Sequence, residues 1–148
     1  MNKNIKTDKS NVKIAIMGKQ TSPEGETSTS RTISPGFFTE TDIKKEIFFT
    51  EKGGSDEEVK TRILYDENMV EIIRDGASSS HMIFEPGKAN MTKYRTSFGT
   101  LLLGVSTKKL EFYTERGKTT IRLTYELLDN TGIISTNETV ISIRFSIE

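Results

Sequence analysis

Apolar and polar residues alternate with a period of two along most of the chain, which is the pattern of half-buried β-strands. Val12, Ile14 and Ile16 are separated by single residues, and this alternation predicts a first strand that ends at Gly18. The same pattern predicts further strands over residues 30–38 (interrupted or ended by Pro35-Gly36), 43–51, 59–66, 69–74, 78–85, 88–96 and 139–147, with two more between 100 and 138. No segment carries a convincing helical stripe, so the pattern predicts an all-β protein.

Turn signals separate the expected strands from residue 59 onward, at the intervals of about 8–12 residues that are typical of β-sandwiches and β-barrels. Asp75-Gly76 is the strongest hairpin signal, because this pair tolerates the positive φ that tight primed turns need. Pro86-Gly87 and residues 97–99 predict two more turns. We interpret residues 52–58, which are rich in glycine and acids, as a flexible solvated turn, since they lack the spaced oxygen ligands of a calcium loop.

Arg116-Gly117 predicts a two-residue hairpin loop. The resulting register pairs Glu115 with Lys118, Phe112 with Ile121, Glu111 with Arg122 and Leu110 with Leu123. Apolar residues then meet on one face of the hairpin and opposite charges meet on the other, as cross-strand pairing favours. The pattern of residues therefore supports this register over its full length.

The strand that precedes this hairpin changes the face on which its apolar residues lie. Leu101, Leu103 and Val105 share a parity that Leu110 and Phe112 do not. A β-bulge or a sharp strand bend shifts the phase in this way, and both are common at barrel corners. The sequence therefore predicts such an irregularity within residues 106–109.

The charge and composition of the chain exclude several functional classes. Its 148 residues include 21 basic and 21 acidic ones, and these are dispersed, whereas nucleic-acid-binding proteins usually carry a basic patch or stripe. The absence of cysteine excludes disulfides and thiolate metal sites. No leader-like apolar region and no run of about 18 apolar residues is present. We therefore expect a soluble cytoplasmic protein with neither a nucleic acid nor a membrane as partner; its oligomeric state is left open.

The chain resembles a known family between residues 69 and 127. The motifs that carry the resemblance are Ile73-Arg74-Asp75-Gly76, Met82-Ile83-Phe84-Glu85-Pro86-Gly87, Tyr94-Arg95-Thr96-Ser97-Phe98-Gly99 and Leu123-Thr124-Tyr125-Glu126-Leu127. They are similar to those of the YwiB-like family of uncharacterised bacterial proteins, and the similarity extends over roughly residues 11–147. The chain departs from this family in its third strand, where Ile47-Phe48-Phe49-Thr50-Glu51 replaces a Tyr-rich, acidic stretch.

The resemblance implies a calycin-like (lipocalin-like) antiparallel β-barrel of about eight to ten strands. We expect residues 1–10 to be a flexible N-terminal segment and residues 11–148 to form this single domain. The family has no established activity, so the resemblance implies a fold and not a function.

Three polar side chains are the candidates for a ligand site inside such a barrel. Arg74 shares strand parity with the apolar Val70 and Ile72, so its guanidinium is expected to point inward. There it either binds a carboxylate or phosphate with its planar fork, or closes the barrel end by bonding carbonyl groups or an internal acid such as Glu51. Tyr94 and Tyr125 are the polar-tipped aromatics nearest to the expected interior, and each either contacts a ligand or hydrogen-bonds within the protein.

Catalytic chemistry has little support in the sequence. His81 is the single histidine, which excludes a multi-histidine metal site. Ser80 and His81 are neighbours on a strand and point to opposite faces. Ser79 shares the face of His81, but neither a nucleophile elbow nor an oxyanion hole accompanies it. We expect no catalytic residue, no metal and no cofactor.

Three functions remain open. The first is a non-enzymatic barrel that binds a small, partly apolar and possibly anionic ligand, whose polar end Arg74, Tyr94 and Tyr125 hold. Its apolar walls are expected to be Leu101, Leu103, Ile121 and Leu123. The second is a protein-interaction or scaffold barrel with a filled core, and the third is an enzyme with acid–base residues at the barrel mouth. A connected inner cavity with converging polar groups would favour the first function.

Overall fold

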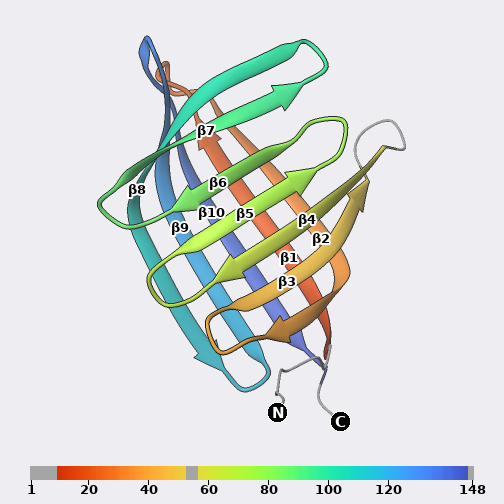
Figure 1. The fold of residues 1–148 in the computed structure, drawn as a ribbon. Coiled ribbons are helices and arrows are strands. Elements are labelled where there is room, and N and C mark those ends of the chain that lie inside the picture. Colours follow the sequence, from red (N-terminus) through yellow and green to blue (C-terminus); the bar gives the residue numbers. More distant parts are fainter. Residues whose placement is uncertain (1–9, 53–56, 147–148) are drawn as a thin grey trace.

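Ten antiparallel strands form one sheet that curls into a nearly closed barrel (Figure 1). The computed structural model describes residues 10–52 and 57–146, and the described part contains no helix. Its strands are β1 (Ser10–Thr21), β2 (Thr27–Glu40), β3 (Lys45–Lys52), β4 (Glu58–Tyr65), β5 (Val70–Asp75), β6 (Ser80–Phe84), β7 (Ala89–Thr96), β8 (Gly99–Glu115), β9 (Lys118–Asp129) and β10 (Gly132–Phe145). Their order in the sheet is β6-β5-β4-β3-β2-β1-β10-β9-β8-β7. The predicted antiparallel barrel of about eight to ten strands is confirmed.

The two terminal strands of the sheet, β6 and β7, approach each other and close most of the barrel. We call their line of contact the β6–β7 seam. At one end of the seam, Ser79 and Arg95 exchange two backbone hydrogen bonds of 2.9 Å. Farther along, side chains replace the backbone ladder: Asn90 donates to the carbonyl oxygen of Ile83 at 3.3 Å, and Thr92 donates to that of His81 at 2.6 Å.

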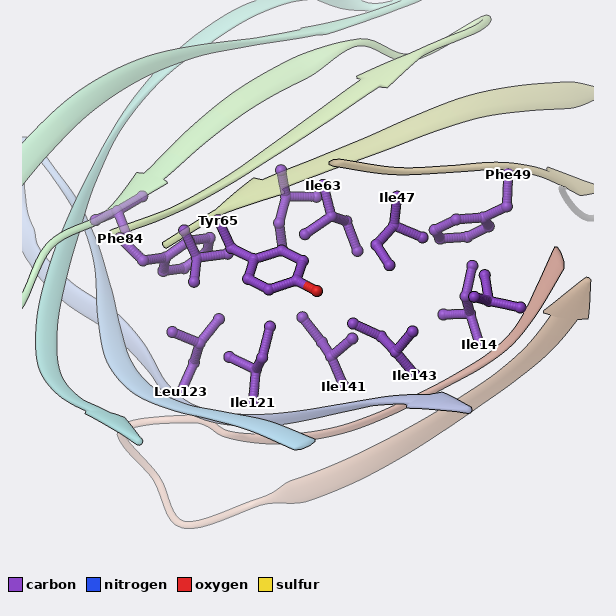
Figure 2. Packing of buried hydrophobic residues seen from close by; sticks show 14 residues of the cluster. Ile14, Ile47, Phe49, Ile63, Tyr65, Phe84, Ile121, Leu123, Ile141 and Ile143 are labelled. Atoms are coloured by element: carbon purple, nitrogen blue, oxygen red, sulfur yellow. The ribbon is translucent and has the colours of Figure 1, made fainter. Parts of the chain in front are cut away.

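The centre of the barrel is filled by apolar side chains from two layers of strands that cross each other. In Figure 1, β3–β6 run across the long strands β1, β2, β9 and β10. Figure 2 shows Ile47, Ile63 and Tyr65 on one side of the core facing Ile121 and Ile141 on the other. These side chains are fully or almost fully buried. They come from every second position of their strands, which is why the period-two pattern is strong there.

The local predictions for the second half of the chain are confirmed. In the β8–β9 hairpin the register pairs Glu115 with Lys118, Phe112 with Ile121, Glu111 with Arg122 and Leu110 with Leu123, as predicted. The register shifts between Thr107 and Lys109, inside the segment where the phase of the apolar residues changes. The bulge leaves the Thr107 hydroxyl buried, and among the described residues it has no hydrogen-bond partner.

Two predicted strand ends in the first half were wrong. β1 continues through Gly18 to Thr21, and β2 runs without a break through Pro35-Gly36 to Glu40. Pro35 is exposed on the outer face, whereas Gly36 is buried on the inner one. A Cβ at Gly36 would lie 2.6 Å from Ile14 Cδ1 and 2.7 Å from the backbone oxygen of Phe48. This glycine permits a close approach of neighbouring strands instead of ending its own strand.

The Asp75-Gly76 hairpin forms, but with a longer connection than predicted. β5 ends at Asp75 and β6 begins at Ser80, so the loop is not a two-residue primed turn. Gly76 does not have a positive φ, and a Cβ at this position would lie 2.8 Å from the backbone oxygen of Glu58. The glycine therefore allows the loop to pack against the start of β4.

Other strand boundaries differ by one to three residues, and the predicted strand at residues 139–147 is the second half of the longer β10. The predicted flexible segment at residues 1–10 falls almost wholly outside the described residues, and β1 begins at Ser10. Most of the predicted turn at 52–58 also lies outside them. In the described part of the chain, no helix has the length and apolar character to span a membrane.

Candidate functional site

One end of the barrel interior is not filled and forms a pocket of about 230 Å³, which we call the Arg74 pocket. Its apolar lining is Ile16 of β1, Ile72 of β5, and Met82 and Phe84 of β6. Its polar lining includes Arg74 of β5, Tyr125 of β9, Asn137 and Thr139 of β10, and the side chains of Gln20, Ser28, Thr29 and Ser30 around the β1–β2 hairpin. The pocket thus joins an apolar floor to a rim of hydroxyls, amides and a guanidinium.

Arg74 reaches this pocket because of its place in the register of β5. It lies opposite Thr61 of β4 and Ser80 of β6, two buried residues on the inner face. Its Nε lies 3.5 Å from Glu51 Oε1, and the same carboxylate oxygen accepts a hydrogen bond of 2.9 Å from the Thr61 hydroxyl. Arg74 therefore both lines the pocket and contacts the internal acid named by the alternative interpretation. The side chain keeps about 36% of its surface exposed.

Tyr125 lies in the same pocket. Its ring packs edge-to-face against Phe84, with 4.8 Å between ring centroids, which fixes the plane of the ring. Its hydroxyl lies 3.4 Å from Thr139 Oγ1, a weak contact by the distances usual for hydroxyl groups. Both Phe84 and Thr139 line the pocket, so Tyr125 places a hydroxyl at the border between the apolar and polar parts of its wall.

Tyr94 is not among the residues that line the Arg74 pocket. It lies on β7 opposite Leu101, near the end of the β7–β8 hairpin. Leu101, expected as an apolar wall, is more than half exposed. Tyr94 and Leu101 both occupy inner-face positions of their strands. Near the end of the β7–β8 hairpin, however, this inner face is exposed. The structure thus brings Arg74 and Tyr125 together and leaves Tyr94 apart.

The other residues that were expected to form apolar walls of the ligand site lie elsewhere in the barrel. Leu103, Ile121 and Leu123 are buried, and none of them lines the Arg74 pocket. Ile121 and Leu123 belong to the central apolar core. They support the barrel from within instead of facing the pocket.

Sequence reasoning missed Asn137 and Thr139, although a signal for them exists. Ile141 and Ile143 are inner residues of β10, and counting back by twos from them gives Thr139, Asn137 and Ser135. Asn137 is buried and donates a hydrogen bond of 2.9 Å to Ser135 Oγ. An apolar strand that becomes polar on its inner face indicates where the core ends and a polar pocket begins.

The charged residues that line the Arg74 pocket are all cationic. Lys19 and Arg74 are the cationic residues of the pocket, and none of its described lining residues is an acid. Glu51 contacts Arg74 at Nε, and the two terminal nitrogens of the guanidinium donate no hydrogen bond to any described residue. A planar pair of donors in a partly dry pocket suits a carboxylate or phosphate group.

His81 lies away from the Arg74 pocket. Its Nε2 is 2.8 Å from Glu71 Oε1, on the exposed side of the strand, and Glu71 also accepts a hydrogen bond of 2.6 Å from Lys44. This Lys44 bond is the main reason that the pKa of Glu71 lies below its ordinary value, with His81 contributing less and burial opposing both. The Ser79 backbone meanwhile bridges to Arg95 across the β6–β7 seam.

Comparison with known proteins gives three matches. The family model described as "Domain of unknown function (DUF1934)" matches residues 14–141. The "Uncharacterized beta-barrel protein YwiB" of Bacillus subtilis (strain 168) is 33% identical over 69 residues, which are 47% of this chain and 49% of that protein. The aligned segment thus spans about half of the length of this relative.

The crystal structure of the ywiB protein from Bacillus subtilis has the same fold. It superposes with a TM-score of 0.83, covers 96% of each chain and is 20% identical in sequence. The resemblance to YwiB-like proteins that the motifs of residues 69–127 predicted is thus confirmed. Because the family model covers most of the chain, this protein belongs to the family described as "Domain of unknown function (DUF1934)", and it is similar to the β-barrel protein YwiB.

Proposed function

We propose that this barrel is a non-enzymatic binding protein for a small anion with a short apolar part, held in the Arg74 pocket. The observation that carries the proposal is the guanidinium of Arg74 in the wall of a pocket whose described lining contains no acid. A buried or half-buried cation requires compensation, and here Glu51 supplies part of it, with 3.5 Å between Arg74 Nε and Glu51 Oε1. The terminal nitrogens of Arg74 are available for a bidentate contact with an anionic group.

The remaining lining favours a ligand with two chemically distinct ends. The hydroxyl of Tyr125 and the amide of Asn137 supply further donors beside Arg74. Ile72, Met82 and Phe84 form a floor that excludes water from an apolar group. In this arrangement the anionic group binds at the polar rim and the apolar group packs on the floor.

The size of the pocket limits the ligand. Its volume of about 230 Å³ is smaller than the ~300–1,000 Å³ typical of pockets for drug-sized molecules. At ~30 Å³ per water molecule, it corresponds to about eight waters. The centre of the barrel is occupied by the core, so a long acyl chain has no room there. We therefore propose a compact carboxylate or phosphate.

Native mass spectrometry of the purified protein tests for a co-purifying molecule, and calorimetry with a panel of small carboxylates, phosphates and their neutral amide or alcohol analogues tests selectivity. We expect anions to bind and their neutral analogues to bind at least tenfold more weakly, because a charge-assisted bidentate contact contributes ~1.5–3 kcal/mol. Arg74→Met should remove this preference. Arg62→Met is the matched control, since Arg62 lies on the neighbouring strand, outside the pocket, paired with Glu46. Equal binding of anions and neutral analogues, or an equal effect of both variants, would refute the proposal.

A second candidate function is a scaffold barrel that binds another macromolecule with its surface. The specific observation in its favour is that several large apolar side chains are exposed while the barrel centre is filled. Pull-down with the intact chain as bait tests it. A partner whose binding survives Arg74→Met would favour the scaffold over the small-anion binder.

A further inference from the structure

The tip of the β7–β8 hairpin presents bare apolar side chains on an ordered turn. Phe98 is 99% exposed, the highest value among the large hydrophobic residues of the described chain that are exposed. Its turn is held by Thr96, whose hydroxyl accepts a hydrogen bond from the Phe98 N–H at 3.1 Å and donates one to the Gly99 carbonyl at 3.1 Å. The aromatic ring is therefore displayed by a defined structure and not by a loose loop.

Both faces of the hairpin end are exposed. Leu101 and Leu102 point to opposite sides of β8, yet they are 55% and 57% exposed. Both faces of β8 are therefore exposed at these positions, and the turn of the β7–β8 hairpin projects from the barrel body in Figure 1. Contiguous exposed apolar side chains of this kind usually mark a binding surface. A flat protein surface would cover one face of the hairpin, whereas a lipid headgroup layer can surround both.

Cations lie beside the exposed apolar side chains of the hairpin end. The segment from Pro86 to Leu110 contains five basic residues and no acid, within a chain of zero formal net charge. Two of these basic residues, Lys93 and Arg95, lie on the hairpin itself, and neither forms an ion pair within the described part of the chain. In the register of the hairpin, Arg95 lies opposite Thr100 and Lys93 lies opposite Leu102, so both cations are at the level of the exposed leucines.

We propose that the β7–β8 hairpin tip docks this protein on an anionic lipid surface. Phe98 at the turn enters the boundary between headgroups and acyl chains, a depth of ~5–10 Å. Arg95, opposite Thr100, then lies at the level of the lipid phosphates, and Lys93 follows it outward, with Leu101 and Leu102 beside the two cations on β8. The expectation of no membrane partner rested on the absence of a long apolar run, which concerns spanning segments. Surface docking requires only a short apolar tip with cations close to it.

The aliphatic content of the tip favours lipid over the other anionic partners. Single-stranded nucleic acid binds through bases that stack on aromatic rings, and the paired leucines supply no such platform. An acidic protein would need a pocket whose shape matches the projecting hairpin. A fluid lipid interface needs no such matching shape. Nucleic acid, acidic protein and a second copy of the chain are therefore alternative outcomes of the test.

The chain contains no tryptophan, so a single introduced tryptophan reports on one position without background. We expect Phe98→Trp fluorescence to shift to shorter wavelength with vesicles of equal parts phosphatidylglycerol and phosphatidylcholine, and to be quenched by brominated acyl chains. Vesicles of phosphatidylcholine alone should give a much smaller change. Phe48→Trp, on the barrel body, is the matched control and should not respond. Adding Lys93→Gln or Arg95→Gln to Phe98→Trp should each weaken binding roughly fivefold.

Several results would overturn the proposal. They are no response of the Phe98→Trp variant to anionic vesicles, an equal response of the Phe48→Trp variant, or an unchanged affinity when both cations are replaced. A blue shift that depends on protein concentration without vesicles would identify a second copy as the partner. A shift produced by an oligonucleotide or an acidic polypeptide, and absent with vesicles, would identify those classes instead. Equal thermal unfolding midpoints of the variants establish that each is folded.

Discussion

The hydroxyl of Thr92 on β7 donates a hydrogen bond of 2.6 Å to the backbone carbonyl oxygen of His81 on β6. This bond crosses the β6–β7 seam, where the two terminal strands of the sheet meet. Apart from the single Ser79–Arg95 bridge, the described strands β6 and β7 are not joined by a backbone ladder. A buried side chain thus takes over the role that a backbone N–H has elsewhere in the barrel.

Thr92→Val should weaken the seam, because it keeps the shape of the side chain and removes the donor to His81. Leaving a carbonyl oxygen unsatisfied costs about 1–2 kcal/mol. Urea unfolding measures the loss, and amide hydrogen exchange should become faster in β6 than in β9. Thr100→Val, on the exposed end of β8, is the control and should change the free energy of unfolding by less than ~0.5 kcal/mol. Equal stabilities of the two variants would show that the Thr92 bond does not hold the seam.

Gly36→Ala tests the close approach of strands inside the barrel. The added Cβ would lie 2.7 Å from the backbone oxygen of Phe48, a contact that rotation of a side chain cannot relieve. We expect a loss of about 1–3 kcal/mol in the free energy of unfolding, measured with denaturant. Gly104→Ala is a matched control, because Gly104 is also buried in a strand, but its nearest contact would be Met91 Sδ at 3.4 Å. A Gly36→Ala protein as stable as Gly104→Ala would contradict the packing described for β2.

The hairpin around Arg116-Gly117 could be predicted because its information is local: each pair lies within about a dozen residues and both faces agree. Arg74 and Tyr125 were found because parity in a strand gives the face of a side chain. Parity does not reveal whether another strand covers the inner face at a given position. For this reason Tyr94 was grouped with Arg74 and Tyr125. Asn137 was missed because a buried amide breaks the apolar pattern from which the inner face was read.

Stability should depend on pH through Glu71. Its pKa in the folded protein lies below the ordinary value of 4.5, chiefly because Lys44 donates a hydrogen bond to it. A lowered carboxyl pKa stabilises the folded state above the unfolded-state pKa, and this contribution is lost as the pH falls through the folded-state pKa. The stability advantage of the natural protein over Glu71→Gln should therefore be present at neutral pH and shrink below about pH 4.5. Denaturant unfolding across this range measures it.

The Lys44→Met background supplies the control for Glu71. With the main cause of the lowered pKa removed, the pH dependence of the Glu71→Gln effect should be smaller. An advantage that grows as the pH falls, or one that is the same in both backgrounds, would contradict the assignment of Lys44 as the chief partner of Glu71.

Tyr125→Phe separates binding from folding at the Arg74 pocket. The ring and its contact with Phe84 remain, and the hydroxyl loses only a 3.4 Å contact with Thr139. We expect the free energy of unfolding to change by less than ~0.5 kcal/mol, and the affinity for a bound anion to fall roughly three- to tenfold through loss of one donor. Calorimetry and denaturant unfolding on the same sample check both. A large loss of stability with unchanged affinity would instead make Tyr125 a structural residue.

Arginine side-chain nitrogen NMR of the natural protein, during addition of the tightest-binding small anion, shows whether Arg74 itself contacts the anion. Arg74 and Arg62 lie on neighbouring strands, the first lining the pocket and the second outside it, so their Nε signals can be compared within one spectrum. We expect the Arg74 signal to shift and to saturate with the affinity measured by calorimetry, while the Arg62 signal stays in place. An Arg74 signal that does not move while the anion binds would contradict this expectation.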